Sequence, residues 1–282
     1  MSVSVVTLNK GRGHHLARLL EGLGRGAPPD EAVVVEMGGD TAPLPDLGFP
    51  IRRTHLNLDG LPLAAARNAG RRAASGDILV YLDVDCIPSA GLVSGLAGAA
   101  SEHDGLICCE IRYLPGGAVS DGWIEADLER VGHRHPARLF PEAGVIPAPQ
   151  PGLFWSLAFA VRAATYDRVG GFDEGFTGYG AEDTDLAFRA ERAGVPVLFA
   201  GGMHAFHQHH LSCDPPLQHF SDIVANARRF HDRHRIWPMD GWLDAFAGLG
   251  LVEADRGGGL TVLRSPTEAE IMAAQVPVHR PF

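Results

Sequence analysis

Short aliphatic runs alternate along the chain with segments in which leucine and alanine recur at helical spacing. Runs of β-branched and aliphatic residues predict buried strands, and these cover residues 3–8, 31–36, 51–56, 77–82, 107–113, 155–162 and 195–200. Amphipathic segments predict helices, one marked by Leu16, Leu19, Leu20 and Leu23 and others over residues 61–74, 90–102, 119–131, 163–169, 182–193 and 218–235. The alternation predicts an α/β fold with a mostly parallel central sheet and helices on both faces.

The second half of the chain is less regular than the first. A proline-rich loop is expected over residues 135–151 and a glycine-rich loop over 170–180. Loops of this length in compact domains usually bind ligands or move. Neither an internal repeat nor a low-complexity linker divides the chain, so we expect a single domain.

Acidic residues outnumber lysine and arginine, 34 to 24, which gives a formal net charge of −10. A field of this sign repels phosphate backbones, so nucleic acid is not an expected partner. A chain of this charge that handles phosphate groups needs a local device, such as a divalent cation or a few placed arginines. The 14 histidines add weight to a metal site.

The cysteine pattern and the N-terminal sequence bear on location. None of the four cysteines forms a Cys-x-x-Cys pair, which is typical of reduced, cytoplasmic proteins; they are Cys86, Cys108, Cys109 and Cys213. No apolar stretch approaches the ~18 residues of a membrane span, and we expect no signal peptide. Residues 220–242 mix aromatic and arginine side chains, which allows either a peripheral membrane helix or a helix that packs on the catalytic core.

Asp83-Val-Asp85 follows a predicted buried strand directly, where ligands bind in open α/β sheets. The tripeptide pattern is common, and its alternative is a solvated turn. A second copy, Asp183-Thr-Asp185, falls on a predicted helix, where residues two apart are separated by about 200° and point to opposite sides. Only the first copy is therefore expected to hold one metal ion, for which carboxylate oxygens suit Mg²⁺ or Mn²⁺.

Glu182 and Asp183 begin a helix directly after the glycine-rich loop. Acidic residues in a first helical turn are favoured by the helix dipole and often serve only as caps. The functional alternative is a carboxylate held at the mouth of a site, where it can accept a proton from an attacking hydroxyl.

A histidine-rich segment, residues 204–210, follows the last predicted strand. If it is extended, His207 and His209 share one face, and His204 and His210 share the other. A single imidazole could complete a metal shell with Asp85, and a solvated histidine cluster is the alternative.

Four segments taken in order resemble family 2 glycosyltransferases of the GT-A fold, the nucleotide-diphospho-sugar transferase fold. They are residues 5–9, Ala-Arg-Asn-Ala-Gly at 66–70, residues 75–88 with Asp-Val-Asp, and residues 169–183 with Gly-Gly-Phe-Asp-Glu and Gly-Ala-Glu-Asp. From residue 155 to 183, and again at 205–208, the chain is similar to the galactosyltransferase-type C-terminal half of chondroitin polymerases and β-1,4-galactosyltransferases. Within the second segment, Arg67 suits a bidentate contact to a phosphate or a carboxylate.

The resemblance implies a domain division. Residues 1–212 would form the catalytic domain, with a nucleotide-binding half over 1–112 and an acceptor-binding half over 113–212. Residues 213–282 would form a helical extension packed on that core.

The resemblance also implies a donor side. Thr7, Asn9 and Arg12 would line the nucleotide, and Glu36 would contact its base, at a position where the family more often has Asp. The expected donor is a nucleoside-diphosphate sugar, with a UDP-sugar favoured. Asn68 would also lie on the nucleotide side.

The same resemblance implies a metal centre and an acceptor side. Asp83 would lie beside the ribose, and Asp85 would bind Mn²⁺ or Mg²⁺ and the diphosphate. His207 would be the second metal ligand, with His209 as the alternative.

Asp183 would act as general base, with Glu182 beside it holding sugar hydroxyls. Trp155 and Tyr179 would stack on sugar faces, and core packing is the alternative for Trp155. Together these roles imply an inverting, metal-dependent transfer to the hydroxyl of a carbohydrate or glycosylated small molecule. The rivals are a retaining transferase or a nucleotidyltransferase on the same fold, and a noncatalytic protein that binds a nucleotide-sugar or glycan.

Overall fold

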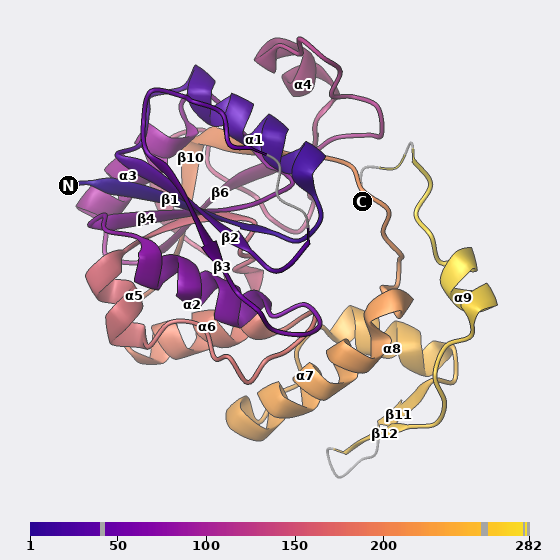
Figure 1. Cartoon of the computed structure of the whole chain (residues 1–282). Helices are drawn as coiled ribbons and strands as arrows, with labels where there is room; N and C mark the ends of the chain where they lie inside the picture. The colour runs from indigo at the N-terminus through magenta and orange to yellow at the C-terminus, as the bar shows by residue number, and fades with distance from the viewer. Residues whose placement is uncertain (40–42, 255–258, 279, 281–282) are drawn as a thin grey trace.

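The centre of the molecule is one sheet with the strand order β3-β2-β1-β4-β9-β6-β10-β5 (Figure 1). The computed structural model describes residues 1–39, 43–254, 259–278 and 280. The strands of the central sheet are β1 (Val3–Asn9), β2 (Glu31–Glu36), β3 (Ile51–His55), β4 (Ile78–Asp83), β5 (Cys86–Pro88), β6 (Leu106–Tyr113), β7 (His133–Arg134), β8 (Val145–Pro147), β9 (Ala158–Arg162) and β10 (Val197–His207). Strands β1 to β4 are parallel neighbours, as are β6 and β10, whereas β9 runs antiparallel between β4 and β6. The predicted α/β class is confirmed.

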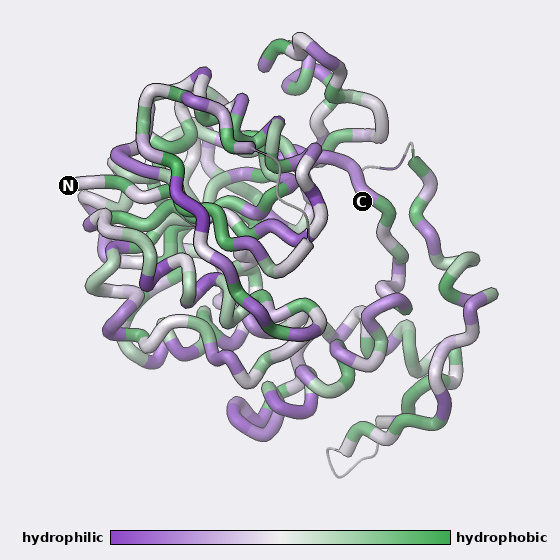
Figure 2. The backbone as a smooth tube through the Cα atoms, viewed as in Figure 1, coloured by the Kyte–Doolittle hydropathy of each residue, from purple (hydrophilic) through white to green (hydrophobic). Residues whose placement is uncertain are grey.

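Helices cover both faces of this sheet because neighbouring strand residues point to opposite sides. On one face, α1 (Gly13–Arg25) and α3 (Leu92–Glu102) pack with Val5 and Val80. On the other, α2 (Leu63–Ala73), α5 (Ala163–Val169) and α6 (Glu182–Arg192) pack with Val6 and Leu79. Hydrophobic segments accordingly concentrate around the sheet (Figure 2).

The C-terminal part contains α7 (Phe220–His234), α8 (Asp240–Gly248), a hairpin of β11 (Val252–Ala254) and β12 (Leu260–Val262), and α9 (Glu268–Ala273). Besides helices, the extension expected over residues 213–282 contains this hairpin, whose Val252 and Leu260 pack in the core of this part. Phe220, Ile223 and Phe230 of α7 are buried. The apolar face that a membrane helix would offer to lipid thus packs inside the protein, and among the described residues no helix is long and apolar enough to cross a bilayer.

Several predicted boundaries differ from the structure. The helix expected over residues 119–131 is reduced to α4 (Glu125–Val131), because Gly122 has a positive φ of 73° and Ile124 is extended. The helix expected from residue 90 begins at Leu92, after the short strand β5. The strand expected over 155–162 begins at Ala158, and the proline-rich loop contains β8.

The last strand of the central sheet is longer than predicted. β10 passes an irregularity between Ala200 and His204 and ends at His207, so it carries the first part of the histidine-rich segment. All four cysteines are free, and the cytoplasmic location inferred from them stays a prediction.

Candidate functional site

Four of the predicted site residues lie where strands of the sheet end. Asn9 ends β1 and pairs in register with Glu36, which ends β2. Asp83 ends β4 beside Leu8, and His207 ends β10 opposite Cys86. The strands therefore bring these side chains to the carboxyl-end side of the parallel sheet, where α/β proteins bind ligands.

Asp85 is the centre of a buried polar cluster at this end. The Arg12 guanidinium forms an ion pair with its Oδ2 atom. His207 Nε2 lies 3.6 Å from Asp85 Oδ1, and His210 Nε2 lies 3.4 Å from Asp85 Oδ2. The ligand atoms of Asp85, His207 and His210 all lie within 4.8 Å of one another.

His210, rather than His209, joins His207 in this cluster. The predicted pairing of His207 with His209 requires an extended chain, but β10 ends at His207 and residues 208–210 have no regular secondary structure. One further hydrogen bond, from Gln208 N–H to Asp85 O at 2.7 Å, continues the pairing of β10 with the segment before β5. The run of four histidines between 204 and 210 indicated a cluster, yet the face of each one depended on where the strand ends.

The donor set suits a divalent transition-metal cation. A carboxylate with two imidazoles is a combination that Mn²⁺ and related ions accept. Burial lowers the pKa of His207 to about 4, so the imidazole is neutral at pH 7 and has a lone pair to offer. Of the two predicted ions, the residues therefore fit Mn²⁺ better than Mg²⁺, which prefers oxygen ligands.

Arg67 connects the acids of β4 with those of α6. It is buried, and its Nη2 lies 3.2 Å from Asp83 Oδ1 while its Nη1 lies 3.0 Å from Glu182 Oε1. Of the two contacts foreseen for Arg67, phosphate or carboxylate, the structure contains the carboxylate one. Burial raises the pKa of Asp83 to about 7, an effect that the Arg67 charge opposes and the nearby Asp85 charge reinforces.

Asp183 lies in the first turn of α6, which follows Ala181 in the left-handed region at a φ of 69°. Its Oδ1 accepts from Thr184 N–H at 2.7 Å, and its Oδ2 accepts from Ser156 N–H at 3.4 Å. Burial, followed by the charge of Glu182, raises the pKa of Asp183 to about 6. A carboxylate with this pKa is deprotonated at pH 7 and is a stronger base than an ordinary Asp.

Asp185 points to the opposite side of α6, as the helical spacing predicts. It is fully buried, and its carboxylate contacts Arg189 Nε at 2.8 Å, Arg233 Nη1 at 2.7 Å and His234 Nε2 at 2.8 Å. These contacts attach α6 to α7, so Asp185 has a structural role.

The family of the chain follows from comparison with known proteins. The family model for glycosyl transferase family 2 matches residues 2–145. The chain belongs to this family. A second model, described as the N-terminal domain of galactosyltransferase, matches residues 148–211 of this family 2 chain.

Relatives of this family 2 chain include a validoxylamine A glucosyltransferase of Streptomyces hygroscopicus subsp. limoneus, 30% identical and covering 91% of the chain. A pre-mycofactocin glycosyltransferase of Mycobacterium tuberculosis is 31% identical and covers 52% of it. The chain spans 62% and 30% of the lengths of these two relatives.

Solved structures with the same fold include GalNAc-T7 with UDP, GalNAc and Mn²⁺, with a TM-score of 0.58 and 16% identity. The match covers 88% of this chain and 57% of the GalNAc-T7 chain. TarS 1–349 of S. aureus with UDP-GlcNAc has a TM-score of 0.54 and 15% identity. This match covers 89% of this chain and 72% of the TarS chain. The predicted GT-A fold is confirmed by these neighbours.

On the predicted nucleotide side of the family 2 chain, Asn9 Nδ2 donates to Glu36 Oε2 at 2.7 Å, and Arg53 Nε donates to Glu36 Oε1 at 3.1 Å. Glu36 is buried and forms an ion pair with Arg53, whose side chain is the more exposed of the two. Thr7 is also buried, and its hydroxyl has no hydrogen-bond partner among the described residues. A cavity of about 500 Å³ adjoins this group, lined by residues that include Asn9, Gly13, Leu16, Pro43, Leu47 and Arg53.

Asn68 contacts a loop instead of the Asp83–Asp85 turn. Its Oδ1 accepts from the Tyr166 hydroxyl at 2.6 Å and from Phe172 N–H at 3.0 Å, and its Nδ2 donates to Phe172 O at 2.9 Å. The side chain thus holds the start of the glycine-rich loop. Its contact with a nucleotide stays a prediction.

The two predicted sugar-stacking residues lie in different surroundings. Trp155 is half-buried next to Ser156, with the His135 ring edge-on at 4.8 Å and the Arg138 guanidinium 4.9 Å from its centroid. The ring of Tyr179 is stacked on His219 at 4.5 Å, where α7 begins. Trp155 lies close to Asp183, because the backbone N–H of the next residue, Ser156, donates to Asp183 Oδ2.

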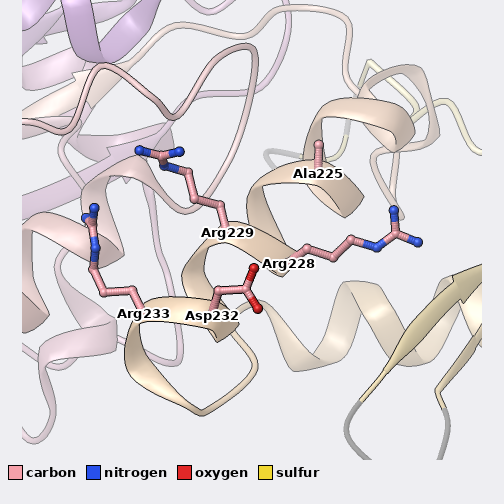
Figure 3. A pocket seen from close by; sticks show the side chains of 5 residues that line it. All are labelled: Ala225, Arg228, Arg229, Asp232 and Arg233. Carbon is pink, nitrogen blue, oxygen red and sulfur yellow. The ribbon is translucent and has the colours of Figure 1, made fainter.

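A second hollow, of about 460 Å³, lies on α7 and is lined by Ala225, Arg228, Arg229, Asp232 and Arg233 (Figure 3). Its arginines are already engaged. Arg229 and Arg233 contact Asp173, and Arg228 Nε donates to Leu260 O at 3.1 Å. This hollow contains no carboxylate pair of the kind found at Asp85 or Asp183.

Proposed function

We propose that this chain is an inverting, metal-dependent glycosyltransferase that moves a sugar from a nucleoside-diphosphate sugar to an acceptor hydroxyl. The observation that carries the proposal is the pairing of two acid groups across Arg67. Asp83 and Asp85 lie at the end of β4, and Glu182 and Asp183 begin α6. One buried guanidinium contacts both groups, at 3.2 Å and 3.0 Å.

We assign to Asp183 the role of general base. Its raised pKa, about 6, lets it take a proton from the acceptor hydroxyl near neutral pH. The two backbone N–H groups of Ser156 and Thr184 hold the carboxylate in place. Attack of the deprotonated oxygen on the far face of the anomeric carbon breaks the bond to the diphosphate and inverts the configuration.

We assign the metal to Asp85, His207 and His210, and of the two predicted ions the pair of imidazoles favours Mn²⁺ over Mg²⁺. Bound there, the cation would neutralise the charge that develops on the nucleoside-diphosphate leaving group. Arg12, which contacts Asp85, is positioned to add positive charge on the same side.

A UDP-sugar is the proposed donor, because two structures of the same fold contain UDP or UDP-GlcNAc. Thr7, Asn9 and Glu36 are assigned to the nucleotide, next to the 500 Å³ cavity. For Glu36 we assign an indirect contact through Arg53, which lines this cavity and forms an ion pair with the buried Glu36 carboxylate.

The proposed acceptor is a carbohydrate or a glycosylated small molecule with a ring that carries several hydroxyls. A relative is named for validoxylamine A, which supports a small acceptor. We assign the stacking on that ring to Trp155, which is half-buried beside Ser156, and to Tyr179, whose pKa is raised by burial and by the charges of Glu182 and Asp183.

The first experiment tests the donor side. Thermal unfolding is measured with UDP, GDP, CDP and dTDP, each with Mn²⁺ or with EDTA, on the wild type and on Asp85→Ala. A ligand at 100 times its Kd adds about 2.7 kcal/mol to the free energy of unfolding. We expect this gain with UDP and Mn²⁺ in the wild type, and its loss in Asp85→Ala.

The second experiment tests the reaction with UDP-glucose, UDP-GlcNAc and UDP-GalNAc. Proton NMR of the product distinguishes inversion from retention at the anomeric carbon. A retained configuration would contradict the role of Asp183. Nucleotide binding without transfer or donor hydrolysis would favour the noncatalytic alternative.

A further inference from the structure

A second group of metal-ligating side chains lies away from the proposed active site, between α4 and β10. Glu125 and Glu129 are one turn apart on α4, so their side chains emerge on the same face of the helix. His204 lies on β10 at the end of the irregularity that begins at Ala200. We propose that Glu125, Glu129 and His204 form a second divalent-cation site.

The geometry of this group fits one ion. The ligand atoms of Glu125, Glu129 and His204 all lie within 4.8 Å of one another, and His204 Nε2 is 3.5 Å from Glu129 Oε1. His204 Nε2 is buried, and the described residues supply no hydrogen bond to it. Buried polar atoms are normally satisfied, so an unsatisfied imidazole nitrogen beside two carboxylates calls for a partner.

The orientation of Glu125 is already fixed by a second contact. Its Oε2 accepts from Ala90 N–H at 2.9 Å, which attaches the first turn of α4 to the chain after β5. A preset carboxylate loses less side-chain entropy when a ligand binds.

The charges of the group call for a divalent cation. Two carboxylates and one neutral imidazole carry a formal charge of −2, and Zn²⁺ accepts three such ligands plus water. Arg112 and Arg134 lie near His204 and would oppose a cation, but both contact Glu110, at 3.2 Å and 3.1 Å. Glu110 thus offsets part of their charge.

This site is separate from the one at Asp85. His204 and His207 are three residues apart on a strand, so their side chains point to opposite faces of the sheet. The His204 ring is edge-on to Phe206 at 4.8 Å, and Phe206 packs in a small core with Trp123 and Leu128. His204 therefore belongs to the face that α4 covers.

A cation at this position would fasten α4 to the sheet. Leu128 is the one side chain of α4 that is buried, so the helix has few other attachments to the core. The proline-rich loop begins directly after β7, which follows α4. Metal binding at the second site would therefore order the segment that leads into that loop.

The test uses Zn²⁺ alone as the probe, in the full chain. Asp85→Ala and His207→Ala together remove the first site and define the background variant. Glu129→Gln is then added, and Asp127→Asn on the same helix is the matched control. Glu129 is 44% exposed, so the substitution leaves the fold intact, which circular dichroism checks.

Isothermal titration calorimetry should show one Zn²⁺ bound by the background variant and by its Asp127→Asn form. Glu129→Gln should weaken this binding by at least about tenfold. Hydrogen exchange of the α4 amides should slow on Zn²⁺ addition in the background variant and stay unchanged with Glu129→Gln. Equal Zn²⁺ affinity with and without Glu129→Gln, or no Zn²⁺ bound by the background variant, would overturn the proposal.

Discussion

The chain contains the pattern Asp-x-Asp twice, and the carboxylates of the two copies have different surroundings. In Asp83-Val-Asp85 both carboxylates lie in the site, where β4 ends. Asp83 contacts Arg67, and Asp85 contacts Arg12 and lies beside His207 and His210. In Asp183-Thr-Asp185 only the first carboxylate faces the site. The second is fully buried and contacts α7.

The difference comes from the local backbone. An extended chain and a turn allow residues two apart to converge on one ligand, whereas a helix separates them by about 200°. A short acidic pattern therefore acquires its meaning from the element that carries it. The same substitution, Asp to Asn, tests this at Asp85, Asp183 and Asp185.

Asp183→Asn should have the largest effect. The amide cannot accept the acceptor's proton, so the transfer rate should fall by about 10²–10⁴-fold, while UDP affinity stays unchanged. Steady-state kinetics and calorimetry with UDP measure the two quantities. Unchanged turnover would remove Asp183 from the mechanism.

Asp185→Asn should destabilise the protein without changing the chemistry. Removing a buried charge that has three cationic or imidazole partners should lower the free energy of unfolding by about 3 kcal/mol. Urea unfolding measures the change, and Asp244→Asn on the exposed surface of α8 is the control. Donor affinity per folded molecule should match the wild type; a loss of affinity equal to that of Asp85→Asn would erase the distinction between the copies.

Asp85→Asn should act on metal-dependent binding. With one carboxylate ligand lost, the affinity for UDP in Mn²⁺ should fall by about a hundredfold, and UDP binding in EDTA should be unaffected. Calorimetry in both buffers gives the comparison. An equal loss in EDTA would point to Asp85 contacting the nucleotide directly.

Glu182→Gln should give the smallest effect, a shift in the pH profile. Asp183 must be deprotonated to act, so the wild-type rate should fall as the pH drops below about 6. Burial is the main cause of the raised pKa and the Glu182 charge is the next, so removing that charge should move the acid limb to lower pH, by about one unit or less. A limb that stays in place would show that burial alone sets this pKa.

The α/β fold could be predicted because buried aliphatic runs, which include Val5, Val6 and Val80, alternate along the chain with segments of helical spacing. Asp85 and Asp183 could also be located from the sequence, since a buried strand and a glycine-rich loop precede them. The helix over 119–131 was overestimated, because its hydrophobic spacing does not reveal the positive φ of Gly122.

Contacts that join distant segments could not be predicted in this way. His210 lies beyond the end of β10 at His207, and its Nε2 lies 3.4 Å from Asp85 Oδ2. Asn68, on a helix that faces the site, instead contacts Phe172, 104 residues further along the chain. Such contacts depend on the path of the loops between the elements, and the spacing of residues along the sequence does not reveal that path.

The position of β9 has a consequence for how the protein assembles. The segment matching family 2 ends at residue 145 and the galactosyltransferase-type segment begins at residue 148, yet β9, from the second, is inserted between β4 and β6 of the first. A fragment that stopped at residue 145 would leave two strands of the sheet without the neighbour that joins them. Arg67 would also lose Glu182, 115 residues away. We therefore expect the two segments to unfold as one cooperative unit, and exchanging the second for that of a relative would require its β9 to match both flanking strands.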